Sequence, residues 1–419
     1  MELKKYKLGE ILDVTRGASL SGEFYATEGK YIRLTCGNFD YQNNCFKENK
    51  SKDNLYYIGD FKPEFLMEEG DIITPLTEQA IGLLGSTAII PESGKYIQSQ
   101  DVAKIICKEE LLDKDFAFYL ISSTLVKQQL SAAAQQTKIR HTSPDKIRDC
   151  TVWIPELTEQ KRIGKLLRSL DRKIELNRAI NQNLEALAKQ LYDYWFVQFD
   201  FPDENGRPYK SSGGKMVWND KLKREIPEGW DDGILIDIAN ITMGQSPDGS
   251  SYNEVGEGML FYQGSTDFGM RFLSVRQYTT APSRFAKKGD ILMSVRAPVG
   301  SINIANNDCC IGRGLSAINS KLGSISHLYY ILNDLRIAFD QRNAAGTTFG
   351  SITKEDLYSL PIIIPSDEVI RAFDKICSPM FDRQMILGEE IDILTKQRDE
   401  LLPHLMNGQV SVNSDLSDD

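Results

Sequence analysis

The sequence predicts an α+β protein in which two pseudo-repeated mixed α/β domains are separated by two long helices that form an antiparallel coiled coil. Two observations predict this fold class. Three phrases recur in the same order in the two halves of the chain, and each half ends in a long segment whose apolar residues follow a heptad spacing. The length of 419 residues is enough for two or three separate hydrophobic cores.

The repeat consists of three pairs of phrases. YKLGEILDVTRGAS matches GILIDIANITMGQSP, which aligns Gly17 with Gly244 at an offset of 227 residues. EEGDIITP matches KKGDILMS, where a Gly-Asp turn opens an apolar strand, and PDKIRDCTVWIPELT matches KEDLYSLPIIIPSDE, which aligns Pro155 with Pro365 at an offset of 210. Each pair alone is a common strand and turn pattern. Their shared order indicates a duplication with loop insertions in the first copy.

A long helix is predicted after each domain. Residues 156–196 contain no proline and one glycine, and their apolar residues alternate at intervals of four and three. This seam consists of Ile163, Leu167, Leu170, Ile174, Leu184 and Leu191, with Asn177 and Asn181 at the two positions between. In residues 366–408 a strict interval of seven connects Phe373, Met380, Leu387, Leu394 and Leu401.

The two helices could each pack against their own domain, or they could pair with each other. We favour pairing, because a pseudo-twofold relation between the halves makes the helices antiparallel, and Asn177 and Asn181 would then fix the register at a cost in stability. At ~1.5 Å per residue each helix would be about 55 to 60 Å long, a ruler between two domains. We expect Pro379 to kink the second helix or to begin its regular part, and Pro403 with Gly408 to end it.

These features divide the chain into six segments. They are a first domain at 1–155, a spacer helix at 156–196, a connecting segment at 197–226, a second domain at 227–365, a C-terminal spacer helix at 366–408 and an acidic tail at 409–419 that we expect to be disordered. The connecting segment has the proline and glycine content of an ordinary linker. No window has the ~18 uninterrupted apolar residues of a membrane span, and no signal peptide is evident, so we expect a cytoplasmic protein.

The net charge of −10 argues at first against nucleic acid, because phosphate contacts normally leave a basic footprint. Charge acts locally, however, so a basic loop on an acidic body can bind DNA while the acidic remainder faces protein partners. Seven cysteines without a CxxC pair and only three histidines argue against a disulfide framework and against a structural zinc site.

Candidate DNA contacts lie in polar loops at the ends of each repeat, where a rigid scaffold presents side chains. The loop QQTKIRHTSPDKIR of the first copy has four lysines and arginines against one aspartate, whereas its partner AAGTTFGSITKED is rich in small and hydroxyl residues. Arginine can pair with guanine, and glutamine or glutamate can pair with adenine or cytosine. Each residue alone fits a solvated loop, and only the repeat-related placement singles it out. The candidates are Arg16, Thr77, Glu78, Gln79, Thr137, Lys138, Arg140, His141, Gln245, Ser246, Arg296, Arg313, Thr347, Thr348 and Ser351.

Several phrases of the second half resemble a known family. The phrases that carry the resemblance are GDILMSVRAPVG, IGRGL, SLPIIIP and the central WFVQFDFPDENGRPYKSSGGKMVWNDKLKREIPEGW. The chain resembles the DNA-specificity subunit of type I restriction-modification systems over nearly its whole length. The resemblance implies two target-recognition domains that each bind one half of a bipartite double-stranded DNA site. The first copy departs from the family pattern, because it reads ITPLTEQAIGLLG where the pattern has a strand with an arginine after its serine.

The same resemblance implies partners rather than catalysis. Family members form a complex with two adenine-methyltransferase subunits and with restriction subunits that act as nuclease and translocase, and the helices and central segment would dock the methylating subunits. They have no catalytic residues of their own. In agreement, this sequence has no GxxxxGK(S/T) loop, no Asn/Asp-Pro-Pro-aromatic methylase signature and no metal-ligand cluster, so no cofactor is expected.

Two other functions stay open from the residues alone. The first is a non-catalytic protein scaffold whose coiled coil joins two ligand-binding domains without touching nucleic acid, which the pI of about 5.1 favours. The second is a fused methylase or nuclease, which the missing motifs argue against. Salt-dependent binding of duplex DNA discriminates the scaffold from the DNA-binding subunit, because phosphate contacts weaken steeply as salt rises.

Overall fold

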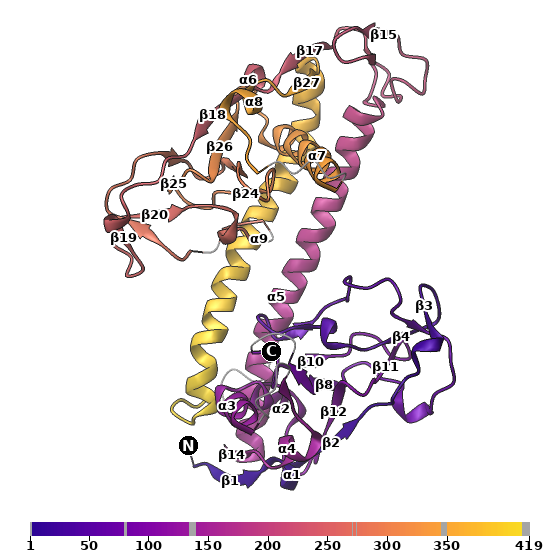
Figure 1. Ribbon diagram of the computed structural model, residues 1–419, viewed down its shortest axis with the longest axis vertical. Coiled ribbons are helices and arrows are strands. Elements are labelled where there is room, and N and C mark those ends of the chain that lie inside the picture. Colours follow the sequence, from indigo (N-terminus) through magenta and orange to yellow (C-terminus); the bar gives the residue numbers. More distant parts are fainter. Residues whose placement is uncertain are drawn as a thin grey trace. The chain divides into compact units, whose positions relative to one another are not determined.

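The computed structural model describes residues 2–78, 82–133, 140–269, 271–273, 275–344 and 350–412, except for the side chains of 337–344. The chain forms two compact units, 1–174 with 393–419 and 175–392, and each contains one mixed α/β domain with part of both long helices (Figure 1). None of the described helices is both long and apolar enough to cross a membrane.

The domain of the first unit consists of short strands and short helices. The strands are β1 (Lys4–Lys7), β2 (Leu12–Arg16), β3 (Tyr25–Ala26), β4 (Tyr31–Arg33), β5 (Phe39–Asp40), β6 (Cys45–Phe46), β7 (Tyr56–Tyr57), β8 (Ile72–Pro75), β9 (Thr77–Glu78), β10 (Ala88–Ile89), β11 (Tyr96–Ile97), β12 (Val102–Cys107), β13 (Arg140–His141) and β14 (Thr151–Ile154). The helices are α1 (Leu8–Ile11), α2 (Lys114–Ile121), α3 (Thr124–Ala133) and α4 (Pro144–Arg148). The apolar run after the first Gly-Asp turn forms β8, which is buried along its whole length.

The domain of the second unit has a similar set of elements. The strands are β15 (Met216–Asn219), β16 (Arg224–Pro227), β17 (Asp231–Ile234), β18 (Ala239–Met243), β19 (Tyr252–Asn253), β20 (Met259–Tyr262), β21 (Tyr278–Thr279), β22 (Phe285–Ala286), β23 (Ile291–Ser294), β24 (Ile302–Ile304), β25 (Cys309–Ile311), β26 (Leu315–Ser320) and β27 (Pro361–Ile364). The helices are α6 (Leu235–Ile238), α7 (Ile325–Ala344) and α8 (Lys354–Tyr358). Figure 1 shows α7 beside the long helices, and its buried residues join sheet and helices in one core.

The two domains share one plan. Each has a four-stranded antiparallel sheet, β10-β8-β12-β2 in the first and β24-β23-β26-β18 in the second. Each also has an outer antiparallel pair, β1 with β14 and β17 with β27, and one parallel pair, β4 with β11 and β20 with β25. The predicted fold class and the duplication are therefore confirmed.

The two long helices are α5 (Leu157–Tyr192) and α9 (Asp367–Met406). They pack against each other in both units. In the first unit Arg398 of α9 donates to Asp171 of α5 at 2.8 Å, and in the second unit Asn177 of α5 donates to Glu390 of α9 at 3.0 Å. The contacted residue number on α9 falls as the number on α5 rises, which defines the predicted antiparallel pair.

The seam residues predicted from the heptads are turned inward. Ile163, Leu167, Ile174, Phe373 and Leu387 are buried, and Leu170, Leu184, Leu191, Met380, Leu394 and Leu401 are half-buried. Asn177 and Asn181 are also buried. The ends of α5 and α9 also contribute side chains to the core of the domain in the same unit. Each helix therefore packs both on the other helix and on a domain.

One role predicted for a proline is wrong. Pro379 does not begin the regular helix, because α9 already begins at Asp367. The helix continues through Pro403 to Met406, close to the end predicted from Pro403 and Gly408 together. The buried side chains of Cys377, Phe381 and Leu405, each two residues from a proline, favour the continuous helix over the one hydrogen bond that each proline removes. The helix ends before Gly408, whose φ of +70° is the left-handed conformation that favours glycine.

The segment after α5 is folded into the second unit. A π-helical turn, Asp193–Val197, continues α5, and β15 and β16 form a hairpin. Phe201 stacks on Tyr209 and on Trp230, with ring centroids 4.7 and 5.0 Å away. At the other end of the chain Val412 N donates to Glu159 Oε1 at 3.1 Å, and residues 413–419 of the predicted tail lie outside the described residues.

Candidate nucleic-acid interface

In the second domain, polar residues from three separate segments gather at one edge of the main sheet. β18 and β23 end at this edge and β26 begins there, because β26 runs antiparallel to both. Gln245 and Ser246 follow β18, Arg296 follows β23, and Arg313 precedes β26. The topology therefore brings together four of the residues that the sequence predicts as DNA contacts.

Hydrogen bonds hold these segments in place. Arg313 N donates to the Ser246 hydroxyl at 3.3 Å, and Val295 N donates to Gly314 O at 2.9 Å. The side chains of Arg296 and Arg313 are exposed, and among the described residues neither guanidinium has a hydrogen-bonding partner. Both are available to a phosphate or to the edge of a guanine.

Gly244 is required by the close approach of two of these segments. Its N–H donates to Leu315 O at 2.9 Å, and a Cβ at this position would lie 2.1 Å from the carbonyl oxygen of Gly312. No other residue fits there without a backbone shift. The glycine that marks the repeat in the sequence thus lets two backbone segments meet at this edge.

Ser351 joins the same edge from the loop before α8. It forms an isolated antiparallel bridge with Arg296, and Ile352 N donates to Val295 O at 2.9 Å. The two threonines that the sequence predicts beside it, Thr347 and Thr348, lie outside the described residues.

The first domain repeats this arrangement around Gly17. Ala18 N donates to Gln98 O at 3.0 Å, and a Cβ on Gly17 would lie 2.3 Å from that carbonyl oxygen. Arg16, at the end of β2, donates through Nε to Gln100 O at 2.8 Å and stays exposed. The ends of β2, β8 and β12 therefore meet as the corresponding strands do in the second domain.

A short strand pair extends the edge of the first domain. β9 and β13 pair Thr77 with His141, whose Oγ1 and Nδ1 atoms are 3.4 Å apart. The two Gly-Asp turns align at an offset of 219, which matches Thr77 with Arg296, and the offset of 210 matches His141 with Ser351; Arg296 and Ser351 form the isolated bridge of the second domain. The same backbone contact thus pairs a threonine with a histidine in the first copy and an arginine with a serine in the second.

Glu78 is turned inward rather than toward solvent. Its side chain is 8% exposed, its Oε1 accepts from Gly82 N at 3.0 Å, and its Oε2 lies 3.6 Å from Nη1 of Arg140. Arg140 also donates to the Ser131 hydroxyl at 2.9 Å. In this arrangement Glu78 positions Arg140 and partly neutralises it.

Three further candidates cannot be assigned to the edge or away from it. Gln79, Thr137 and Lys138 lie outside the described residues. Two other basic residues of the same loop support the fold, since Lys146 Nζ donates to Ala133 O at 2.8 Å and Arg148 Nη1 donates to Val14 O at 3.0 Å.

Gln263 and Arg284 are exposed residues of the second domain that sequence reasoning missed. A Cβ on Gly314 would lie 2.5 Å from Gln263 O, and Ile311 N donates to Arg284 O at 2.9 Å, so both lie beside the turn that contains Arg313. The glycines of IGRGL were the available signal, because glycine before a strand often marks the close approach of another backbone.

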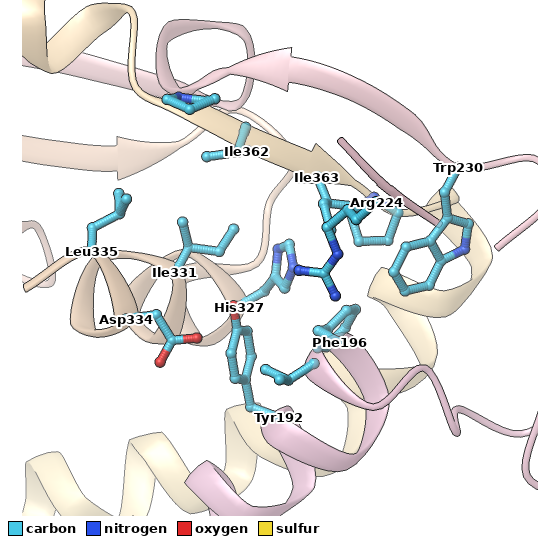
Figure 2. A pocket seen from close by; sticks show the side chains of 13 residues that line it. Tyr192, Phe196, Arg224, Trp230, His327, Ile331, Asp334, Leu335, Ile362 and Ile363 are labelled. Carbon is cyan, nitrogen blue, oxygen red and sulfur yellow. The ribbon is translucent and has the colours of Figure 1, made fainter. Parts of the chain in front are cut away.

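A cavity of about 220 Å³ lies elsewhere in the second unit, and Tyr192, Phe196 and Trp230 form part of its wall (Figure 2). His327 also lines it, and burial lowers the pKa of this imidazole to about 3. Burial likewise raises the pKa of Asp334, which lies on the same helix as His327, α7. The described residues contain no group of three side chains suited to a metal ion, and this aromatic crevice shows no catalytic arrangement.

Acidification is expected to destabilise the second unit through His327. The unfolded chain takes up a proton near pH 6.5, whereas the folded chain resists protonation until about pH 3, so the free energy of unfolding falls as the pH falls through this window. Between pH 7 and pH 5.5 the loss should be about 1 kcal/mol. Urea denaturation of the wild type and of His327→Leu measures it, and an equal loss in both proteins would contradict this assignment.

The repeated edges and the paired helices define a class of protein in which two domains of one plan are carried on a pair of long helices. Residues 1–186 and 227–395 match the family described as the type I restriction modification DNA specificity domain, and the chain belongs to this family. It is a specificity subunit of a type I restriction-modification system, recognises a DNA target and is itself non-catalytic.

Relatives along the whole chain support this assignment. The chain is 29% identical over 378 residues to a protein of Methanocaldococcus jannaschii named the putative type I restriction enzyme MjaX specificity subunit; the match covers 86% of this chain and 84% of that protein. It is 24% identical over 374 residues to the HindI specificity subunit of Haemophilus influenzae, with 76% and 81% covered. A crystal structure of the type I S subunit from M. genitalium shares the fold, with a TM-score of 0.64 and 18% identity over 97% of this chain and 96% of that one.

Proposed function

We propose that each domain binds one half of a bipartite double-stranded DNA site through the sheet edge at its close-approach glycine, Gly17 in the first domain and Gly244 in the second. The supporting observation is that the two domains bring equivalent strand ends together with a glycine at the same place, while the exposed side chains around them differ. Different side chains would read different half-sites. The proposed contacts are Arg16, Thr77, Gln79, Thr137, Lys138, Arg140, His141, Gln245, Ser246, Arg296, Arg313, Thr347, Thr348 and Ser351, with Glu78 positioning Arg140.

The helix pair would set the gap between the two half-sites. α5 has 36 residues and α9 has 40, so at ~1.5 Å per residue they are about 54 and 60 Å long. Major-groove stretches about one helical turn of DNA apart are ~34 Å from each other. Helices of this length can therefore connect two domains that read one face of a duplex.

The helices would also dock the partner subunits. In the second unit the apolar side chains of Leu187, Tyr194, Ile376 and Ile386 are exposed, and a groove of about 800 Å³ is lined by three of them. Contiguous apolar groups on an exposed surface mark protein contacts. Two adenine-methyltransferase subunits would bind the helices and the connecting segment, and the restriction subunits would complete the complex in the cytoplasm.

The test is the salt dependence of duplex DNA binding by the complex assembled with its methylating subunits. The affinity of the wild-type complex for DNA should fall steeply as the salt concentration rises. If Arg313 contacts a phosphate, Arg313→Gln should lower the slope of log affinity against log salt by about 1. If Arg313 contacts a base, the substitution should cost about 1–3 kcal/mol of binding free energy at one base pair of one half-site. Lys7→Gln is the control, because Lys7 forms an exposed pair with Asp149 outside the edge, the helices and the connecting segment. Binding that is absent or independent of salt would support the scaffold function instead.

A further inference from the structure

Each unit contains a charged network that joins its domain to both long helices; it is buried in the first unit, and in the second its arginine is buried while its carboxylate, Glu185, is partly exposed. In the first unit Asp171 of α5 accepts hydrogen bonds from the Tyr119 hydroxyl of α2 at 2.5 Å and from Arg398 of α9 at 2.8 Å. All three side chains are buried. One carboxylate thus holds a domain helix and the helix pair together.

The second unit has an equivalent network made of other residues. Glu185 of α5 pairs with Arg271 of the domain and accepts from Gln384 Nε2 of α9 at 3.1 Å. Arg271 is 6% exposed, and its guanidinium lies 4.4 Å from the ring centroid of Phe381 and 5.0 Å from that of Tyr329. Again one carboxylate of α5 contacts both the domain and α9.

The segment that contains Arg271 fits α9 at one place. A Cβ on Gly388 would lie 1.8 Å from the ring of the adjacent Phe272, so this ring occupies the space that a side chain would fill. Gly388 is the only glycine of α9. Ile304 N donates to Arg271 O at 3.0 Å and ties the segment to β24. Moving the domain by one helical turn would bring Phe272 against a larger residue.

The second network is poorly explained by stability. Among the described residues, no hydrogen-bond partner is found for five buried polar atoms: Arg271 Nε and Nη2, Asn181 Oδ1, Gln384 Oε1 and the Tyr330 hydroxyl. Buried polar groups without partners are costly, and buried ion pairs often add nothing to stability compared with apolar residues of similar volume. Specifying one position is the better-supported role for such a network.

The two networks have the same spacing on both helices. Asp171 and Glu185 are 14 residues apart on α5, and Gln384 and Arg398 are 14 residues apart on α9. Two heptads keep both networks on the same seam. We infer that the networks are register keys: each fixes its domain at one position along the helix pair, so that the gap read in the target depends on them as well as on helix length. This inference rests on the proposed function.

The test measures methylation by the assembled complex on a DNA library with fixed half-sites and a variable gap. The wild type should methylate one gap length. Three variants should also methylate DNA with neighbouring gap lengths: Arg271→Gln, the double substitution Arg271→Met with Glu185→Leu, and Tyr119→Phe. In each, selectivity for the original gap should fall on the order of tenfold. Lys288→Gln, which removes an exposed pair with Glu389 at 2.5 Å, should leave the gap selectivity unchanged.

The apolar double substitution separates position from stability. Its melting temperature should stay close to that of the wild type, because apolar residues replace an ion pair whose arginine is buried, while its gap selectivity falls. If the double variant and Arg271→Gln both methylated only the wild-type gap length, the inference that the networks are register keys would be wrong, while the proposed function would stand. A wild-type complex that methylates without regard to the gap would overturn the proposed function, and the keys with it.

Discussion

Replacing Gly244 by alanine is expected to abolish recognition of one half-site and to leave recognition of the other intact. The new Cβ would lie 2.1 Å from Gly312 O, and this backbone cannot move freely, because Gly312 N donates to Tyr262 O at 2.8 Å. Overpacking of this kind costs typically ~1–3 kcal/mol and would displace Arg313. Loss of a bidentate base contact lowers discrimination about 10- to 100-fold. Methylation of plasmids that carry altered versions of each half-site measures the effect.

Two matched substitutions control this experiment. Gly249→Ala places a Cβ where nothing lies within 4 Å, so it should leave both half-sites unchanged. Gly17→Ala should abolish the other half-site, because its Cβ would lie 2.3 Å from Gln98 O. If Gly17→Ala and Gly244→Ala impaired the same half-site, the assignment of one half-site to each domain would be wrong.

Replacing Asp171 by alanine is expected to destabilise the first unit by about 3–5 kcal/mol. The substitution leaves Arg398 buried beside an unfilled space and removes the acceptor of the Tyr119 hydroxyl, which is itself buried. Thermal or urea denaturation of the full chain measures the loss in the transition of the first unit.

The control is Asp149→Ala in the same unit. Asp149 pairs with Lys7 at 3.0 Å, but both side chains are well exposed, so the loss should stay below about 1 kcal/mol. Equal effects of Asp149→Ala and Asp171→Ala would show that the buried network has no special role in holding the first unit together.

The duplication and the helices could be predicted because their signals are periodic and local. A seven-residue interval and a Gly-Asp turn before an apolar run depend only on neighbours in the sequence, and both recur at a nearly constant offset. Gly17 and Gly244 stood out for the same reason, although their physical role as points of close approach needed the structure.

The rest of the candidate site depends on contacts between distant segments. Gln263 and Arg284 reach the edge only through the sheet around β25, and the inward orientation of Glu78 depends on Gly82 N and Arg140. Arg271 was not predicted, because nothing in its local sequence shows that it pairs with a glutamate 86 residues away. The prediction that the regular helix could begin at Pro379 is wrong, because α9 extends on both sides of this proline.

Inserting four residues, about one helical turn, into 170–190 of α5 tests the central claim most directly. The target methylated by the complex is then determined by sequencing modified adenines, with the uninserted protein as reference. The two-domain reading predicts that both half-sites keep their sequences and that the gap between them changes. Altered half-sites with an unaltered gap would contradict it.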